Sequence, residues 1–83
     1  MSLQRLAEAK TISVGTKQTT KAVGEGKALT VYLAADADAH IAQSIRSLCE
    51  AHHVPVITVA TMIELGKACG IQVGAAMAAI IAE

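Results

Sequence analysis

An apolar run at residues 28–35 constrains the fold of this 83-residue chain more than any other feature. The run is apolar on both of the faces that alternating residues of a strand present, so helices have to cover it on each side. Segments of helical and strand character alternate along the whole chain. This pattern predicts an α/β protein, namely a three-layer α/β/α sandwich with a central mixed four-stranded sheet.

Local signals place four helices and four strands in strict alternation, beginning with a helix. Ser2 is a candidate N-cap of the first helix, Thr16 of the second and Asp38 of the third, because short polar side chains accept bonds from free helical N–H groups. Thr61 and Glu64 have the spacing of a capping box for the fourth helix. The expected strands are Thr11–Val14 and residues 28–35, 54–59 and 75–81, and the expected helices are residues 3–9, 17–25, 39–53 and 62–69.

Length and composition indicate one small folded domain over residues 1–83. A chain of this size buries one core but hardly a deep cleft, and a hydrophobic content of 53% argues against disorder. The apolar side chains are small, since 17 residues are alanine and Tyr32 is the single aromatic residue. With one aromatic ring the protein cannot read single strands by base stacking, so any RNA partner should be structured.

The formal net charge is zero, but the charges are unevenly distributed along the chain. Residues 1–27 carry five basic and two acidic side chains, and residues 28–83 carry two basic and five acidic ones. The basic third can present a local positive face to phosphates, although ordinary surface charge is the alternative interpretation.

Cysteine usage and hydropathy indicate a cytoplasmic, soluble protein without a membrane partner. Cys49 and Cys69 form neither a CxxC pair nor a larger disulfide framework, so buried thiols in a reducing compartment are expected. The N-terminus lacks the apolar region of a signal peptide, and the apolar stretch at residues 71–82 is shorter than the ~20 residues of a membrane span.

Residues 15–21 carry the strongest functional signal. Lys17 lies at an expected helix N-terminus, where the partial positive charge disfavours a cation by roughly 0.3–1 kcal/mol, and Lys21 lies one turn further on the same face. A bound anion would relieve both costs. Gly15 leaves room for a nucleic-acid backbone, the threonine hydroxyls add donors, and Gln18 and the lysines can bond base edges. The alternative is a solvated helix with two surface lysines, capped by Thr16.

The connection at residues 70–76 is the second candidate segment. Val73, Gly74 and Ala75 can form a small apolar shelf with exposed backbone N–H groups, against which an unstacked base can lie. The alternative is a tight connection whose apolar residues belong to the core, and for Ile71 this alternative is preferred.

Catalytic and metal-binding patterns are absent from the sequence. Cys49 and His52 have ligand-like spacing, but a zinc site needs about four converging ligands. Asp36 and Asp38 fit as turn and cap residues rather than as an acid/base pair. We therefore expect no enzyme activity, no cofactor and no metal.

Four segments occur together in an informative order and spacing. They are Gly15-Thr16-Lys17-Gln18-x-x-Lys21, Ala34-x-Asp36-x-Asp38, Leu65-Gly66-Lys67-Ala68-Cys69-Gly70 and the loop at residues 71–76. In this combination the chain resembles the ribosomal protein L-seven-Ae / L-thirty-e superfamily, and most closely its bacterial YbxF-type kink-turn RNA-binding proteins. The resemblance covers essentially the whole chain.

The resemblance implies an α/β/α sandwich that binds kink-turns, in which sheared G·A pairs beside a bulge bend an RNA duplex sharply. By position, Lys17, Gln18 and Lys21 would contact the guanines and phosphates of those pairs. The RNA could belong to the ribosome or to a riboswitch or other regulatory RNA. A monomer is expected, and DNA is not an expected partner.

The same resemblance assigns roles to the other segments. Gly15 and Thr16 would allow close approach of the RNA backbone, Asp38 would face the extruded bulge nucleotide, and residues 73–75 would cover it. Archaeal and eukaryotic relatives usually carry Asn-Glu at positions 17–18, so a neutral acceptor replaces an acidic one here. Val73 stands where several relatives have a basic residue, which weakens phosphate contact.

Two other functions remain open from the sequence. The first is a protein–protein interaction module of the same fold without specific RNA binding. The second is a small nucleotide- or phosphate-handling enzyme, although no arrangement of residues in the sequence predicts one.

Overall fold

The computed structural model describes residues 2–83, and side chains from residue 3 onward. The capping role expected of the Ser2 side chain lies outside this part. Within it, helices and strands alternate in the predicted order. The helices are α1 (Ser2–Glu8), α2 (Thr16–Gly24), α3 (Ala39–Ala51) and α4 (Met62–Ala68), and the strands are β1 (Thr11–Val14), β2 (Thr30–Ala34), β3 (Val56–Val59) and β4 (Met77–Ala82).

The four strands form one mixed sheet in the order β1-β4-β2-β3. β4 pairs antiparallel with both β1 and β2, whereas β2 and β3 are parallel. The parallel pair is connected through α3, as a parallel crossover requires. The last strand of the described chain therefore lies inside the sheet, between the first and the second strand.

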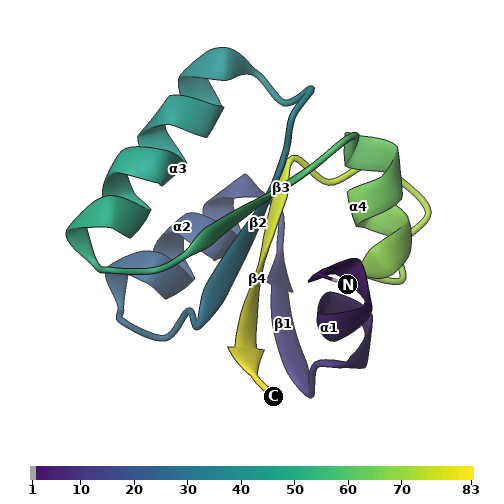
Figure 1. The fold of residues 1–83 in the computed structure, drawn as a ribbon, viewed down its shortest axis with the longest axis horizontal. Helices are drawn as coiled ribbons and strands as arrows, with labels where there is room; N and C mark the ends of the chain where they lie inside the picture. The colour runs from purple at the N-terminus through teal and green to yellow at the C-terminus, as the bar shows by residue number, and fades with distance from the viewer. Residues whose placement is uncertain (1) are drawn as a thin grey trace.

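Helices cover both faces of the sheet, so the predicted three-layer α/β/α sandwich is confirmed (Figure 1). Alternate residues of β2 and β4 point to opposite layers, as the two-residue period of a strand dictates. One layer packs α1 and α4 on the sheet and includes Leu6, Tyr32, Leu65, Ala78 and Ile80. The other packs α2 and α3 and includes Val23, Val31, Leu33, Ile45, Cys49, Met77 and Ala79.

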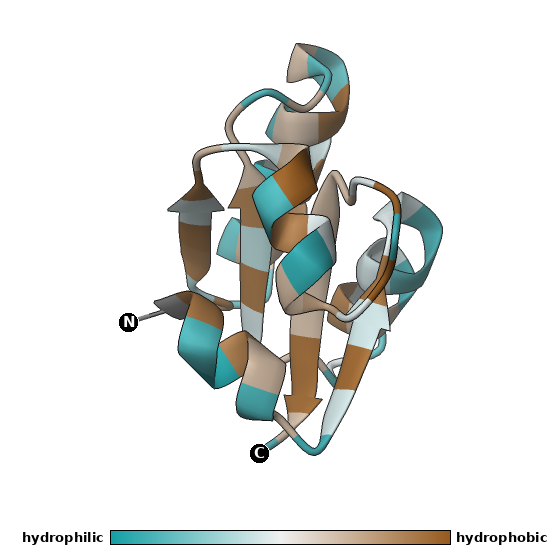
Figure 2. Ribbon diagram, turned by 90° about the vertical axis from the view of Figure 1, so that its right-hand side faces the viewer, coloured by the Kyte–Doolittle hydropathy of each residue, from teal (hydrophilic) through white to brown (hydrophobic). Residues whose placement is uncertain are grey.

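The small side chains expected from the composition lie mainly at the centre of the sheet. Ala78 and Ala79 on β4 are fully buried, one on each face. In Figure 2, β4 is beige to brown along its length and β2 alternates brown with pale segments, while the helices in front of the sheet alternate hydrophobic and hydrophilic patches. Amphipathic helices thus supply the large apolar groups that the alanines of the sheet lack.

Three strands begin two residues later than expected, namely β2 at Thr30, β3 at Val56 and β4 at Met77. β2 begins at Thr30, although the Leu29 N–H already donates to the Ile80 carbonyl of β4 at 2.8 Å. β4 begins at Met77, since the Ala75 N–H donates to the Met62 carbonyl of α4 and not to a neighbouring strand. No helix in residues 2–83 is long and apolar enough to span a membrane.

The central position of β4 makes its side chains sensitive to truncation. We expect Ile80→Ala to lower the free energy of unfolding by about 2–5 kcal/mol, because it opens a cavity at a fully buried site. Ile63→Ala is the matched control. Its side chain is 65% exposed, so a change within about 0.5 kcal/mol is expected. Urea denaturation followed by circular dichroism measures both, and equal losses would contradict this layering.

Candidate nucleic-acid interface

Three separate segments meet at one end of the sheet, at the ends of β1, β2 and β3 and the start of β4 (Figure 1). The Gly15 N–H donates to the Met77 carbonyl at 2.9 Å, which joins the start of α2 to β4. The Ala34 N–H donates to the Ala76 carbonyl at 2.9 Å, which joins the end of β2 to the loop before β4. Both segments singled out by the sequence, together with the turn that holds Asp38, therefore lie at the same end of the sheet.

The first of these segments, at residues 15–21, begins differently from the sequence-based expectation. Thr16 is the first residue of α2 and not its cap, so that prediction is wrong. Gly15 is the N-cap, without a side-chain bond and with φ of 96° and ψ of 164°, a conformation that side-chain-bearing residues rarely adopt. The Thr19 N–H makes the first helical bond, to the Gly15 carbonyl at 3.0 Å. The N–H groups of the preceding residues are therefore left at the helix end.

Three long polar side chains project into solvent from this first part of α2. Lys17, Gln18 and Lys21 are exposed. In the described residues the ion pairs are Arg5–Glu83 and Lys27–Glu25, and neither involves Lys17 or Lys21. The threonines of the segment do not all contribute donors, because Thr19 is fully buried. The helix start thus combines two uncompensated cations with free backbone donors.

The two aspartates after β2 act as turn and cap residues, as predicted. Asp38 caps α3, since its Oδ1 accepts from the N–H groups of His40 at 2.9 Å and Ile41 at 3.2 Å. Asp36 reaches across to α4, where its Oδ1 accepts from the Met62 N–H at 2.8 Å. Asp38 remains exposed, so its carboxylate lies at the protein surface at this end of the sheet.

The loop between α4 and β4 is held against α4 by two close backbone approaches. A Cβ on Gly66 would collide with the Val73 carbonyl oxygen, and a Cβ on Gly74 would come within 3.2 Å of the Met62 Cβ. The Ala75 N–H donates to the Met62 carbonyl at 3.0 Å. The loop is therefore positioned by its backbone.

The expected apolar shelf is only partly formed by this loop. Val73 is 71% exposed and Gly74 is exposed, which agrees with the prediction. Ala75 is buried and its N–H is already bonded, so the prediction of an exposed shelf with free N–H groups is wrong for this residue. Ala75 anchors the loop and offers little surface. Ile71 packs against the core, which agrees with the core role preferred for it from the sequence.

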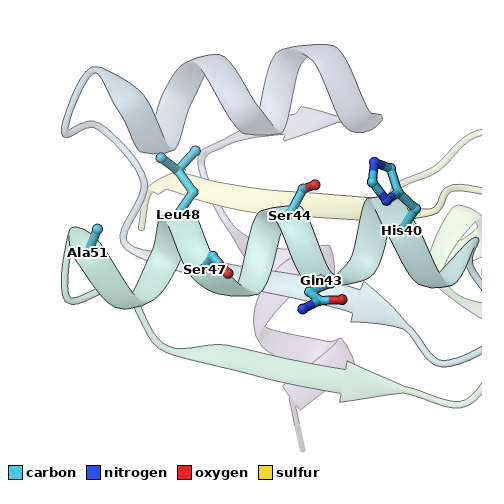
Figure 3. A pocket seen from close by; sticks show the side chains of 6 residues that line it. All are labelled: His40, Gln43, Ser44, Ser47, Leu48 and Ala51. Carbon is cyan, nitrogen blue, oxygen red and sulfur yellow. The ribbon is translucent and has the colours of Figure 1, made fainter.

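A hollow of about 640 Å³ lies along α3, outside the three converging segments (Figure 3). It is lined by His40, Gln43, Ser44, Ser47, Leu48 and Ala51. His40 and Ser44 lie one turn apart, yet in the described part of the chain their side chains are not bonded to each other. The triad arrangement of base and nucleophile is thus not formed there.

The described residues also form no metal-binding cluster and no activated thiol. Across residues 2–83, no group of three or more His, Cys, Asp or Glu side chains could hold a metal ion. Both cysteines are free thiols, Cys49 buried and Cys69 half-buried. Burial raises the pKa of each thiol, which disfavours the nucleophilic thiolate.

Over residues 1–83 the sequence matches the Ribosomal protein L7Ae/L30e/S12e/Gadd45 family. The chain belongs to this family. It is 46% identical over 81 residues to "RNA-binding protein YbxF" of Geobacillus stearothermophilus, with 98% of this chain and 99% of the relative covered. It is 41% identical over 81 residues to an "RNA-binding protein" of Bacillus pumilus, with the same coverage. The resemblance to the family and its YbxF-type members is thereby confirmed.

The fold is shared with a protein of known structure. The "Giardia lamblia 15.5kD RNA binding protein" superposes with a TM-score of 0.86 at 32% identity, covering 98% of this chain and 68% of that one. These family members are named as RNA-binding proteins, and none of these names points to an enzyme.

The sequence analysis did not predict the roles of three residues at this end of the sheet. Met62 was predicted only to be helical, but its N–H donates to Asp36 and its carbonyl accepts from the Ala75 N–H. Gly66 was noted only as part of a motif, although it makes room for the Val73 carbonyl. Ile63 is exposed beside the loop at residues 71–74. A glycine inside a helix was the available signal for Gly66, because glycine there costs roughly 0.8–1 kcal/mol relative to alanine.

Gly66→Ala is expected to destabilise the fold and displace the loop at residues 71–76. Alanine is favoured in a helix by up to about 1 kcal/mol, but overpacking against the Val73 carbonyl should cost about 1–3 kcal/mol and outweigh it. Gly24→Ala, at the end of α2 with open space around the glycine, should be neutral or slightly stabilising. Thermal unfolding compares the two variants, and stabilisation by Gly66→Ala would contradict the close approach.

The two thiols should differ in reactivity. Because burial raises both pKa values, alkylation by iodoacetamide should be slow at pH 7 and accelerate as pH rises. Cys69 should react before Cys49, which is the more buried of the two. Mass spectrometry of the alkylated protein gives the order, and rapid modification of Cys49 in the native protein would contradict the packing of α3.

Proposed function

We propose that residues 1–83 act as a single domain that binds kink-turn motifs in structured RNA and stabilises their bent form. The RNA would be ribosomal or regulatory, such as a riboswitch. Selective binding of the bent conformation is sufficient to stabilise it, because a ligand shifts an equilibrium toward the state it prefers.

The observation that carries this proposal is the convergence of three segments at one end of the sheet. Backbone hydrogen bonds hold these segments in place: Gly15 bonds to Met77 of β4, Ala34 to Ala76 of the loop before β4, and Ala75 to Met62 of α4. An RNA that presents base edges, a sharp bend and an extruded nucleotide close together can meet all three segments at once. A straight duplex would contact fewer of them.

The start of α2 is suited to the guanines and phosphates of the G·A pairs. Lys17 and Lys21 are exposed and free of ion pairs among the described residues. Lysine bonds well to guanine O6 and N7, and free N–H groups at a helix start favour phosphate. Gln18 would accept from a guanine amino group through its amide oxygen. Gly15 and Thr16 would let the RNA backbone approach.

The opposite side of the interface would hold the extruded bulge nucleotide. Asp38 would face this nucleotide with its exposed carboxylate, while Val73 and Gly74 would cover the base. Ala75 would act through the position of the loop, since its side chain is buried. Shape, a few base edges and few phosphates would therefore dominate recognition, with a modest dependence on salt.

Binding to a kink-turn RNA tests the proposal against a duplex in which Watson–Crick pairs replace the G·A pairs. We expect strong preference for the kink-turn in Mg²⁺-containing buffer, and a loss of about tenfold or more on Lys17→Ala or Lys21→Ala, corresponding to roughly 1–3 kcal/mol per base contact. Isothermal titration calorimetry gives the affinities, and a fluorophore pair on the two RNA arms reports the bend.

Lys10→Ala is the matched control for charge, because Lys10 precedes β1 at the opposite end of the sheet. It should leave the preference for the kink-turn unchanged. Equal, weak binding to both RNAs, with no effect of Lys17→Ala, would refute the proposal. A protein–protein module of the same fold would then become the leading interpretation.

A further inference from the structure

A second hollow borders the interface between α4 and the loop that follows it. It has a volume of about 470 Å³ and is lined by Ile63, Lys67, Ile71, Gln72, Val73 and Gly74. Neither Asp38 nor another residue of the turn after β2 lines it. The hollow is therefore separate from the position proposed for the extruded nucleotide, although Val73 and Gly74 border both.

Exposed apolar side chains are concentrated at this hollow. Ile63 is 65% exposed and Val73 is 71% exposed. In the part of the chain that the structure describes, Leu29 is the other exposed large hydrophobic residue, at 48%. Leu29 precedes β2 at the far end of the sheet, so two of these three side chains share this one hollow. Apolar groups concentrated in this way mark a binding surface.

The backbone that forms the walls of the hollow is held in place by contacts within the protein. Ile71 packs against the core below α4, and its N–H donates to the Gly66 carbonyl at 3.1 Å. The Val73 carbonyl lies directly over Gly66. Figure 2 shows the loop returning beside α4 with hydrophobic colour on its outer course. A preformed wall lowers the entropic cost of binding.

The charge on the rim favours an anionic group. Lys67 is exposed and, among the described residues, belongs to no ion pair. None of the six lining residues is acidic. Glu64, the acidic residue of α4, is engaged by the Thr61 hydroxyl at 3.3 Å. Apolar walls, one cation and the amide of Gln72 together match a nucleotide, which has flat base faces, polar base edges and a phosphate.

We propose that this hollow binds a second unstacked nucleotide of the same RNA, next to the one assigned to Asp38. Ile63 and Val73 contact the faces of the base, Gln72 bonds its edge and Lys67 contacts its phosphate. This inference rests on the proposed kink-turn binding and extends it.

The decisive experiment combines protein variants with RNAs in which each unpaired or flanking nucleotide is replaced, one at a time, by an abasic residue. Ile63→Ala should weaken binding of the intact kink-turn RNA about fivefold, from the apolar area it leaves uncovered. On one particular abasic RNA that loss should vanish, because the base that contacts Ile63 is already missing. Such a non-additive pair is the signature of direct contact.

Lys67→Ala provides an independent readout of the phosphate contact. It should reduce the slope of log affinity against log salt concentration by about 0.7, as expected for one contact to single-stranded RNA. Leu29→Ala and Lys10→Ala are matched controls for exposed apolar area and for charge, and both should leave affinity and slope unchanged. Thermal unfolding of Ile63→Ala checks that the fold is intact.

The outcomes separate this inference from the proposed function. If Lys17→Ala abolishes the kink-turn preference while Ile63→Ala and Lys67→Ala behave like the controls, the hollow does not bind RNA and the inference is overturned alone. An Ile63→Ala loss of equal size on every abasic RNA also overturns it. Unchanged RNA affinity with altered self-association in sedimentation would assign the hollow to a second copy of the chain. No preference for the kink-turn in the unmodified protein would overturn the proposed function itself.

Discussion

The pairing of β4 on both of its edges is the constraint on which the rest of the structure depends. β4 joins β1 to β2, and four of its residues are buried between the helical layers. The strand comes last in the described chain, so the sheet stays divided until residues 77–82 insert between β1 and β2. Folding therefore relies on contacts between distant parts of the sequence, which slows it relative to a helical bundle of this size.

The candidate interface follows from the same pairing. β4 starts where β1, β2 and β3 end, so segments of very different sequence position come to one edge. Gly15 and Ala34 bond directly to the backbone at the start of this strand. The candidate interface is thus assembled from element ends and short turns, which hold its polar groups at fixed spacings.

Much of the fold could be predicted because it depends on local chemistry. The capping roles of Asp38 and Thr61 follow from residue type and spacing, and both side chains accept the expected helical N–H bonds. The alternation of strand and helix followed from hydrophobic period. Thr16 was misassigned because Gly15 takes a backbone conformation that makes it the cap without any side chain, and residue type alone does not reveal this.

The candidate site was predictable only where its residues are neighbours in sequence. Lys17, Gln18 and Lys21 lie within five consecutive residues of one helix, so their exposure could be expected from helical period. The contribution of Ile63 could not, since it depends on the return of a loop ten residues further on. Burial of Ala75 likewise follows from a bond to α4 that no spacing rule specifies.

The peptide groups around Met62 join three elements, because Asp36 accepts its N–H and Ala75 donates to its carbonyl. Neither bond can break without exposing a polar group at the start of α4. The turn after β2, the first turn of α4 and the loop before β4 should consequently open and close as one cooperative unit, rather than fray separately. Local fluctuations at this end of the sheet should therefore displace the turn that holds Asp38 and the loop at residues 71–76 together.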